Sequence, residues 1–414
     1  MLKHPGIRRL LAAIVACALL QSVGLQAAWA QEVGVVGTGT PGSCTEAALD
    51  SALAGGGAVT FNCGPNPATI TLSVQKAIGA NTTIDGGSNV ILSAHGSRHF
   101  VVNTGASLTV SNITLRDGFA NGDGGSIFNS GTVVISNTLL TNNTAVNGSG
   151  GAIVSYGTLT ILQSTFEDNA GANGGAVYPR WDGAHTFVDH SIFRRNSTTS
   201  VTDGWGGAIL LWDGAQLAIQ DSLFEENSAT SGGAIFNFPR SSIVMTRTIV
   251  SANTAQYGAG IYNQRAALTI GDSTLRGNVA TRFGGGIDNR GGNVVINNSV
   301  LNDNSVNYLE GTGGAVNNVY DSDVAGVLAM TDSTISANDA GQRGGGIFSN
   351  SDTQLLRVTL DHNVAPAGGA VYNEGALEVD TSTLSDNSAA VAGALYQAGD
   401  ALTVIYTTIA DNPA

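Results

Sequence analysis

Charged residues are scarce in this sequence, and lysine is almost absent. Only 12% of the 414 residues are charged, and Lys3 and Lys76 are the only lysines. The 31 acidic residues outnumber the 17 basic ones, which gives a net charge of −14. Such a chain repels nucleic acid and anionic membranes, so neither is an expected partner. Disorder is also excluded, because 42% of the residues are hydrophobic and can fill a core.

The first thirty residues have the pattern of a secretory signal peptide. Arg8 and Arg9 precede an apolar run at 10–23, and Ala-Trp-Ala at 28–30 offers a small-x-small cleavage site. A membrane anchor fits less well, because the run is short for a span and a cleavage signal follows it. We therefore expect a mature chain from Gln31 without a membrane span and with a net charge of 14 − 31 = −17. We expect it to be secreted, extracellular or on the outer surface of a bacterial cell.

Cysteine is rare as well. There are three, and Cys17 lies inside the predicted signal. Cys44 and Cys63 remain in a compartment that permits disulfides, so we expect them to form one. A bridge across this short loop would stabilise the fold by about 3 kcal/mol. Two buried free thiols are the alternative.

Glycine, by contrast, is abundant and marks a repeat. From Gly124 onward, a small triplet followed by an aliphatic residue recurs, with 26 residues between the first two aliphatic positions, 127 and 153. A period of this length indicates a repeat architecture. The aliphatic residues of this marker are Ile127, Ile153, Val177, Ile209, Ile235, Ile261, Ile287, Val316, Ile347, Val371 and Leu395.

A second marker alternates with the first and consists of a large apolar residue followed three positions later by asparagine. The fifth position before each large residue is always apolar, and the seventh is apolar except at Thr186 and Thr353. A separation of two is the strand period, so each pair points to one side of a short strand. The fifth-position residues are Ile135, Ile161, Val188, Ile219, Met245, Ile270, Ile296, Met330, Leu355, Val379 and Val404.

Each repeat thus offers three short strands, separated by turns rich in Gly, Asn, Asp and Ser. One repeat cannot bury its apolar face alone. Repeats that wind once around an axis, however, pair their strands in parallel at about 4.8 Å and turn all apolar positions inward. Neither the leucine spacing of leucine-rich repeats nor the four strands of a propeller blade is present. We predict an all-β, right-handed parallel β-helix of about a dozen or more coils, with glycine pairs and asparagines stacked at its turns.

The N-terminal part is less regular. We predict a flexible leader at 31–43, an N-terminal cap with less regular first coils at 44–107, and regular coils at 108–414. Within the cap, residues 45–54 place their apolar side chains on one helical face, so we expect a helix that covers the first coil. At the other end we expect a partner or a further segment to cover the last coil, or nothing to cover it.

The repeat resembles that of the chlamydial-type polymorphic outer membrane proteins and, more broadly, the pectate-lyase-like β-helix superfamily. The resemblance rests on the alternation of Gly-Gly-Ala-Ile with the large apolar residue and its asparagine, and it covers about residues 124–412. It implies a β-helix fold and an adhesin exported by a C-terminal membrane barrel. This sequence contains no such barrel, so the resemblance predicts neither the export route nor the surface attachment. A fold alone supplies no function.

The tryptophans of the mature chain gather where one coil grows to 32 residues, from Val177 to Ile209. Two of the three, Trp181 and Trp212, occur in similar tripeptides, Trp-Asp-Gly at 181–183 and at 212–214, so we expect one indole near the other. Aromatic faces beside carboxylates and arginines suit a glycan. The alternative is a tryptophan stack packed over its own loop. The predicted ligand-binding residues are Trp181, Trp205, Trp212, Arg180 and Asp203.

The same tripeptides predict that Asp182 stacks near Asp213. Two neighbouring carboxylates can bind Ca²⁺ or share a proton. Asp321 and Asp323, in another long coil, are further Ca²⁺ candidates, although a solvated loop explains them better. No cofactor other than this possible Ca²⁺ is predicted.

A catalytic site is not evident, but candidates can be named. Val188-Asp189-His190 faintly resembles a motif of pectate lyases, yet other coils carry Asp before Ser at the same turn, so a decorated turn also explains it. The Gly-His-Gly triplet and acid pairs of polygalacturonases are absent, and arginine is almost the only available lyase base. The candidates for an enzyme are Asp182, Asp213, Asp189, His190 and Arg194.

The sequence therefore predicts a non-catalytic, adhesin-like or glycan-binding structural module. Its expected partner is a cell-surface glycan, a polysaccharide or a surface protein. The alternative function is that of a polysaccharide lyase or glycoside hydrolase acting in a groove near Trp181 and Trp212.

Overall fold

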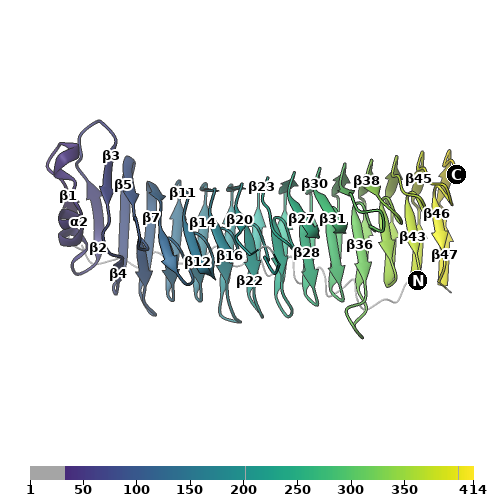
Figure 1. Ribbon diagram of the computed structural model, residues 1–414, viewed down its shortest axis with the longest axis horizontal. Coiled ribbons are helices and arrows are strands. Elements are labelled where there is room, and N and C mark those ends of the chain that lie inside the picture. The colour runs from purple at the N-terminus through teal and green to yellow at the C-terminus, as the bar shows by residue number, and fades with distance from the viewer. Residues whose placement is uncertain (1–32, 201, 400) are drawn as a thin grey trace. The chain divides into compact units, whose positions relative to one another are not determined.

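The described part of the chain is a right-handed stack of β-coils, as predicted. The computed structural model describes residues 33–200, 202–399 and 401–414, and the predicted signal peptide at 1–30 lies outside them. The solenoid has about 14 turns and is 3% helical. Figure 1 shows the coils in sequence order, from α2 (Glu46–Leu53) at one end to the C-terminus at the other. Within the described residues, no helix combines the length and apolar character that crossing a membrane requires.

Sheet A is the largest sheet, and its 27 strands pair in parallel from coil to coil. In each regular coil it receives one strand of five residues, then a turn, then one strand of three. Its strands are β1 (Val33–Val36), β2 (Gly57–Phe61), β3 (Ala68–Thr71), β5 (Thr82–Ser93), β7 (Ser107–Arg116), β10 (Thr132–Ser136), β11 (Leu139–Thr141), β14 (Thr158–Leu162), β15 (Thr165–Glu167), β18 (His185–Asp189), β19 (Ile192–Arg194), β22 (Gln216–Gln220), β23 (Leu223–Glu225), β25 (Ser242–Thr246), β26 (Ile249–Ser251), β29 (Ala267–Gly271), β30 (Thr274–Arg276), β33 (Asn293–Asn297), β34 (Val300–Asn302), β37 (Val327–Thr331), β38 (Thr334–Ser336), β41 (Asp352–Leu356), β42 (Thr359–Asp361), β44 (Ala376–Asp380), β45 (Thr383–Ser385), β47 (Ala401–Ile405) and β48 (Thr408–Ala410).

Two further sides close the coil. Sheet B has 13 strands: β4 (Lys76–Ile78), β6 (Phe100–Val102), β9 (Ile127–Asn129), β13 (Ile153–Ser155), β17 (Val177–Pro179), β21 (Ile209–Leu211), β24 (Ile235–Asn237), β28 (Ile261–Gln264), β32 (Ile287–Arg290), β36 (Val316–Val319), β40 (Ile347–Ser349), β43 (Val371–Asn373) and β46 (Leu395–Gln397). The third side holds two four-stranded sheets, made of β8 (Phe119–Asn121), β12 (Thr144–Ser149), β16 (Ala170–Asn173) and β20 (Ser197–Thr198), and of β27 (Thr254–Tyr257), β31 (Val279–Phe283), β35 (Ser305–Val306) and β39 (Asp339–Ala340).

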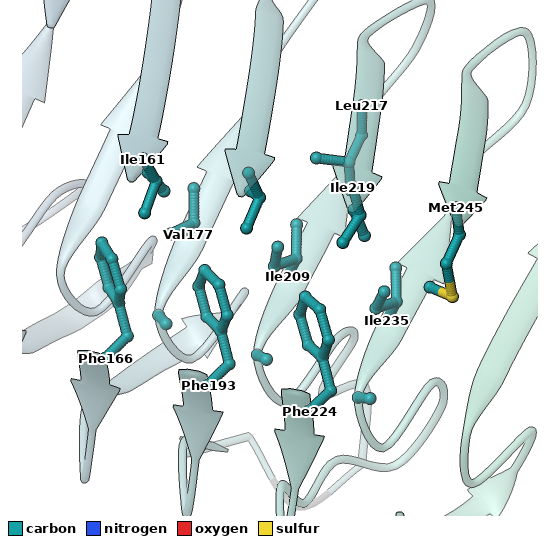
Figure 2. Packing of buried hydrophobic residues seen from close by; sticks show 14 of the residues in the cluster. Ile161, Phe166, Val177, Phe193, Ile209, Leu217, Ile219, Phe224, Ile235 and Met245 are labelled. Atoms are coloured by element: carbon teal, nitrogen blue, oxygen red, sulfur yellow. The ribbon is translucent and has the colours of Figure 1, made fainter. Parts of the chain in front are cut away.

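The predicted inward residues form continuous columns. Ile161 pairs with Ile135 of the coil before it, Ile219 with Val188, and Ile270 with Met245, and all lie in the core. Phenylalanines of successive coils stack in parallel inside the core, with ring centroids 4.8 Å apart between Phe166 and Phe193 and 4.7 Å apart between Phe193 and Phe224 (Figure 2). The sequence period and the strand period together therefore identify the core, because both place like residues above one another.

The predicted asparagine stack is a buried hydrogen-bond ladder. In each coil the Nδ2 group donates to the Oδ1 atom of the next asparagine at 2.9–3.0 Å, from Asn143 through to Asn412. The same Oδ1 atom accepts the backbone N–H of the asparagine before it, as between Asn169 and Asn143 at 3.1 Å. This ladder satisfies turn groups that would otherwise be buried without partners.

The glycine pairs mark corners that admit no side chain. Gly150 has a φ of 71°, which L side chains rarely adopt. A Cβ on the following Gly151 would lie 2.0 Å from the carbonyl oxygen of Gly175 in the next coil. Larger residues at this marker would force the coils apart.

The N-terminal cap is present, but the predicted flexible leader is wrong. The helix α2 buries Leu49 against the core, and Cys44 and Cys63 form the predicted disulfide. Residues 33–36 form β1, which pairs in parallel with β2, and η1 (Pro41–Ser43) follows. Val36 is fully buried, so apolar burial orders this segment.

The last described coil exposes its inward side chains. Leu402 and Val404 in β47 are 43% and 42% exposed. Their counterparts one coil earlier, Leu377 and Val379, are buried. The expectation of a partner or further segment over this coil stays a prediction.

Candidate functional site

An aromatic cluster covers the outer face of sheet B. The middle residues of the sheet B strands point away from the core and form a column, and side chains from the flanking turns pack over that column. Together they make a second hydrophobic cluster, outside the solenoid core. We call its aromatic members the aromatic strip: Phe128, Tyr156, Tyr178, Trp205, Trp212, Phe236, Phe238, Tyr257 and Tyr262.

Trp212 lies at the centre of the aromatic strip. Its ring stacks on Phe238 with centroids 3.9 Å apart and on Trp205 at 5.7 Å. Phe236 continues the contact, with ring centroids 5.6 Å from Trp205 and 4.6 Å from Tyr262. Trp205, Trp212 and Phe238 are half-buried, so part of each ring reaches solvent. The indoles of this coil thus form a surface on the solenoid, not a part of its core.

Trp181 and Trp212 are neighbours, as predicted, because the Trp181 N–H donates to the Trp212 carbonyl at 3.1 Å. Their indoles do not stack: among the described residues, the Trp212 ring packs on Trp205 and Phe238 instead. The turn between β17 and β18 spans residues 180–184, whereas the turn between β21 and β22 spans 212–215 and is one residue shorter. The register of Val177 with Ile209 continues to Arg180, which pairs with Trp212, so Trp181 lies one position beyond Trp212. The extra residue is taken up later in this turn, before His185 pairs with Gln216. Trp181 itself takes a φ of 74° and is 43% exposed.

Arg180 instead links Trp181 to the strip. Its guanidinium carbon lies 4.8 Å from the ring centroid of Trp181, 5.6 Å from that of Tyr178 and 5.8 Å from that of Tyr156. Its Nη1 donates to the Tyr156 hydroxyl at 3.1 Å and to Asp123 Oδ2 at 3.3 Å. Among the described residues, no group accepts a bond from its buried Nε. This end of the strip therefore combines flat rings with polar groups that can bind hydroxyls.

The three aspartates of this region have separate roles. Arg240 donates to Asp213 through Nε at 2.8 Å and through Nη2. Asp182 packs so closely on Gly214 that a Cβ there would lie 1.5 Å from its Oδ1. Asp203 is exposed and accepts the Thr202 hydroxyl at 3.2 Å. Because Arg240 neutralises Asp213, the geometry supports an ion-paired turn better than two carboxylates sharing a proton.

Asp189, His190 and Arg194 lie at the other end of β18 from Trp181, so the predicted residues fall into two places. His190 Nδ1 is 2.6 Å from Asp189 Oδ1 on the turn between β18 and β19. Arg194 Nη2 donates to Glu167 Oε2 at 2.7 Å. Arg194 and Glu167 also line an open groove of about 380 Å³ on the outer face of sheet A.

The Ca²⁺ candidates Asp321 and Asp323 both face one arginine, Arg265. Arg265 Nε lies 2.8 Å from Asp321 Oδ2, and its Nη2 lies 3.7 Å from Asp323. This guanidinium already supplies the positive charge that Ca²⁺ would bring, so the pair does not fit the ion. Among the described residues, two other groups bring three possible ligand atoms within 4.8 Å of one another: Asp189, His190 and Asp221, and Asp361, His362 and Asp386.

Comparison with known proteins identifies the architecture. A family model described as a right handed beta helix region matches residues 98–304, which is half of the 414-residue chain. The chain belongs to the right-handed β-helix family. No curated protein matches the chain.

The segment that matches the right-handed β-helix family includes a buried ion pair that the sequence analysis missed. Asp288 takes the outward position that Tyr262 takes one coil earlier, and it is fully buried. Its Oδ2 accepts from Arg290 Nε at 3.0 Å and its Oδ1 accepts from Asn317 Nδ2 at 2.7 Å. Arg290 lies over Tyr257 at 5.1 Å, and the adjacent Asp288 carboxylate raises the pKa of its guanidinium. The available signal was a charge at an outward position that the preceding coils fill with apolar side chains.

Proposed function

We propose that this β-helix is an extracellular, non-catalytic protein that binds glycans on the aromatic strip. The stack of Trp212 with Trp205 and Phe238 carries the proposal, because its rings are packed on one side and open to solvent on the other. Sugar rings have flat apolar faces that such surfaces bind, and Arg180 with Asp123 supplies polar groups beside them.

Two features of the sequence support this placement outside the cell. The signal pattern at 1–30 predicts export, and the disulfide between Cys44 and Cys63 suits an oxidising compartment. The repeat also resembles that of the polymorphic outer membrane proteins, which are adhesin-like. A glycan-binding or adhesin-like module follows from these features taken together with the strip.

Replacing Trp212 by alanine is expected to weaken glycan binding by about tenfold or more, because central aromatic residues dominate binding surfaces. Binding would be found on an array of oligosaccharides and soluble polysaccharides, then measured by titration calorimetry. Tyr406→Ala is the control, since this aromatic side chain is 88% exposed and lies outside the strip. The proposal fails if no glycan on the array binds, or if both variants bind as tightly as the natural protein.

Polysaccharide cleavage is the second candidate, favoured by the contact of His190 with Asp189 near the groove of Arg194. An imidazole oriented by a carboxylate is a common general base. We nevertheless expect no ultraviolet absorbance from unsaturated product, and no new reducing ends, when acidic polysaccharides are incubated with the protein, with or without Ca²⁺. Turnover that disappears in His190→Ala or Arg194→Ala would replace the non-catalytic proposal with this one.

A further inference from the structure

We infer that the aromatic strip binds a linear polysaccharide lying along the solenoid axis, spanning several coils. The inference rests on the proposed function and adds the class and direction of the ligand. Its basis is the way in which the rings are distributed over successive coils.

Every coil from β9 to β28 places at least one ring on the outer face of sheet B. Tyr178, Phe236 and Tyr262 are themselves buried and support the partly exposed rings, which are Phe128, Tyr156, Trp205, Trp212, Phe238 and Tyr257. The outward position holds Phe128, Tyr178, Phe236 and Tyr262 in four of these strands. In the remaining two strands, β13 and β21, that position is aliphatic, and the following turn supplies the ring instead. These two substitutes are Tyr156 after Val154 and Trp212 after Leu210.

The rings are also continuous along the axis. Phe128 and Tyr156 lie 5.4 Å apart, and Arg180 bridges Tyr156 to Tyr178. The Trp212 stack and Phe236 then lead to Tyr262. Because β9, β13, β17, β21, β24 and β28 pair in succession, the strip follows five coil steps, roughly 24 Å at about 4.8 Å each.

Both ends of this strip are marked by arginines. At the first coil, the guanidinium carbon of Arg98 lies 5.8 Å from the Phe128 ring centroid. At the other end, Arg290 lies over the Tyr262 ring, and the next outward position holds the buried Asp288. A single terminal sugar would contact one or two coils, so most rings of the strip would have no sugar in contact with them. A polymer that repeats its contacts from sugar to sugar uses the whole length.

The test is a length series of the glycan that binds. Cello-, xylo-, manno-, chito- and galacturono-oligosaccharides of about two to about eight sugars would be titrated calorimetrically against the full chain. We expect affinity to rise by at least about tenfold with length, because a longer oligosaccharide reaches more of the partly exposed rings along the strip. Trp212→Ala should weaken binding at every length.

A variant at the end of the strip separates this arrangement from a single compact site. Phe128→Leu should weaken the longest oligosaccharides about threefold or more and leave the shortest unchanged. Tyr396→Leu is the matched control, because Tyr396 is also a half-buried outward residue of sheet B but lies outside the strip. Far-ultraviolet circular dichroism would confirm that each variant is folded.

The outcomes distinguish the two claims. Binding that is lost in Trp212→Ala but does not depend on length overturns the inference and leaves the proposed function standing. A Phe128→Leu effect that is equal at all lengths, or no larger than that of Tyr396→Leu, also overturns it. If no oligosaccharide or polysaccharide binds, the proposed function itself fails.

Discussion

Replacing Asn253 by alanine is expected to lower the free energy of unfolding by roughly 4 kcal/mol. Asn253 is fully buried, and its Oδ1 accepts the backbone N–H and the Nδ2 of Asn227 at 2.9 and 3.0 Å. Its Nδ2 donates to the Phe224 carbonyl at 3.1 Å and to Asn278 Oδ1 at 2.9 Å. Alanine replaces none of these bonds and leaves the Asn227 N–H buried without a partner, which costs more than the bonds themselves contribute.

The measurement combines thermal unfolding with hydrogen exchange. We expect a lower melting temperature and faster exchange in the turns around Asn227 and Asn253, because each coil depends mainly on its neighbours. Asn302→Ala is the matched control: this amide contacts Asp303 on an exposed turn one coil beyond Asn278. Equal melting temperatures for the two variants would show that the ladder contributes no more than a surface amide.

The ladder and the core illustrate what the sequence predicts well. Ile161, Ile219 and Ile270 could be assigned to one interior face because two periods, the strand alternation and the coil repeat, act on the same side chains. Burial then fixes the register, since a shift of one residue would turn the whole apolar set outward. The same reasoning predicted the asparagine stack, because the asparagine keeps a constant distance from the large apolar residue.

The turns were harder to predict, since their lengths vary without a buried face to hold them in register. The turn before β18 has one extra residue, and Trp181 lies one position beyond Trp212, with its ring outside the Trp212 stack. The sequence analysis also did not predict a second amide ladder, on sheet B. There, hydrogen bonds of 2.8 Å join Asn237 to Asn263 and Asn263 to Asn289. Its signal is an asparagine two residues after the aliphatic marker, and the tryptophan coils interrupt it with Pro179 and Leu211.

The aromatic strip could not be assembled from sequence for a related reason. Its rings come from two different sources, the middle of a sheet B strand and the turn after it, as with Tyr178 and Tyr156. Only the coil register shows that these positions lie on one surface. Trp205 joins from a third segment, the turn that precedes β21.

The second large effect is expected from pH, through His99. This imidazole is fully buried in the first coils, where its Nε2 lies 2.9 Å from the Leu92 carbonyl and its Nδ1 lies 2.9 Å from the Ser126 hydroxyl. Burial lowers the pKa of His99 from 6.5 to about 4, although the bond to Leu92 and the nearby Asp117 charge oppose the shift. The folded protein therefore keeps this side chain neutral.

The sign of the effect follows from proton binding. Between pH 6.5 and about pH 4 the unfolded chain binds a proton on this histidine that the folded chain does not. The free energy of unfolding therefore falls as the pH falls through that window, by up to about 1.4 kcal/mol per pH unit and about 3 kcal/mol in total. Above pH 6.5 the contribution is constant, because His99 is neutral in both states.

The free energy of unfolding of the natural protein and of His99→Gln would be measured with urea across this pH range. The difference between the two proteins isolates the contribution of His99, because their carboxylates are the same. Glutamine keeps a donor and an acceptor but cannot be protonated, so the stability of the natural protein relative to the variant should fall by about 3 kcal/mol between pH 7 and pH 4. His95→Gln, at an exposed histidine of the preceding turn, is the control for replacing a histidine in this part of the chain. If the curves of His99→Gln and the natural protein run parallel, His99 binds its proton equally in both states, against the burial that the structure gives it.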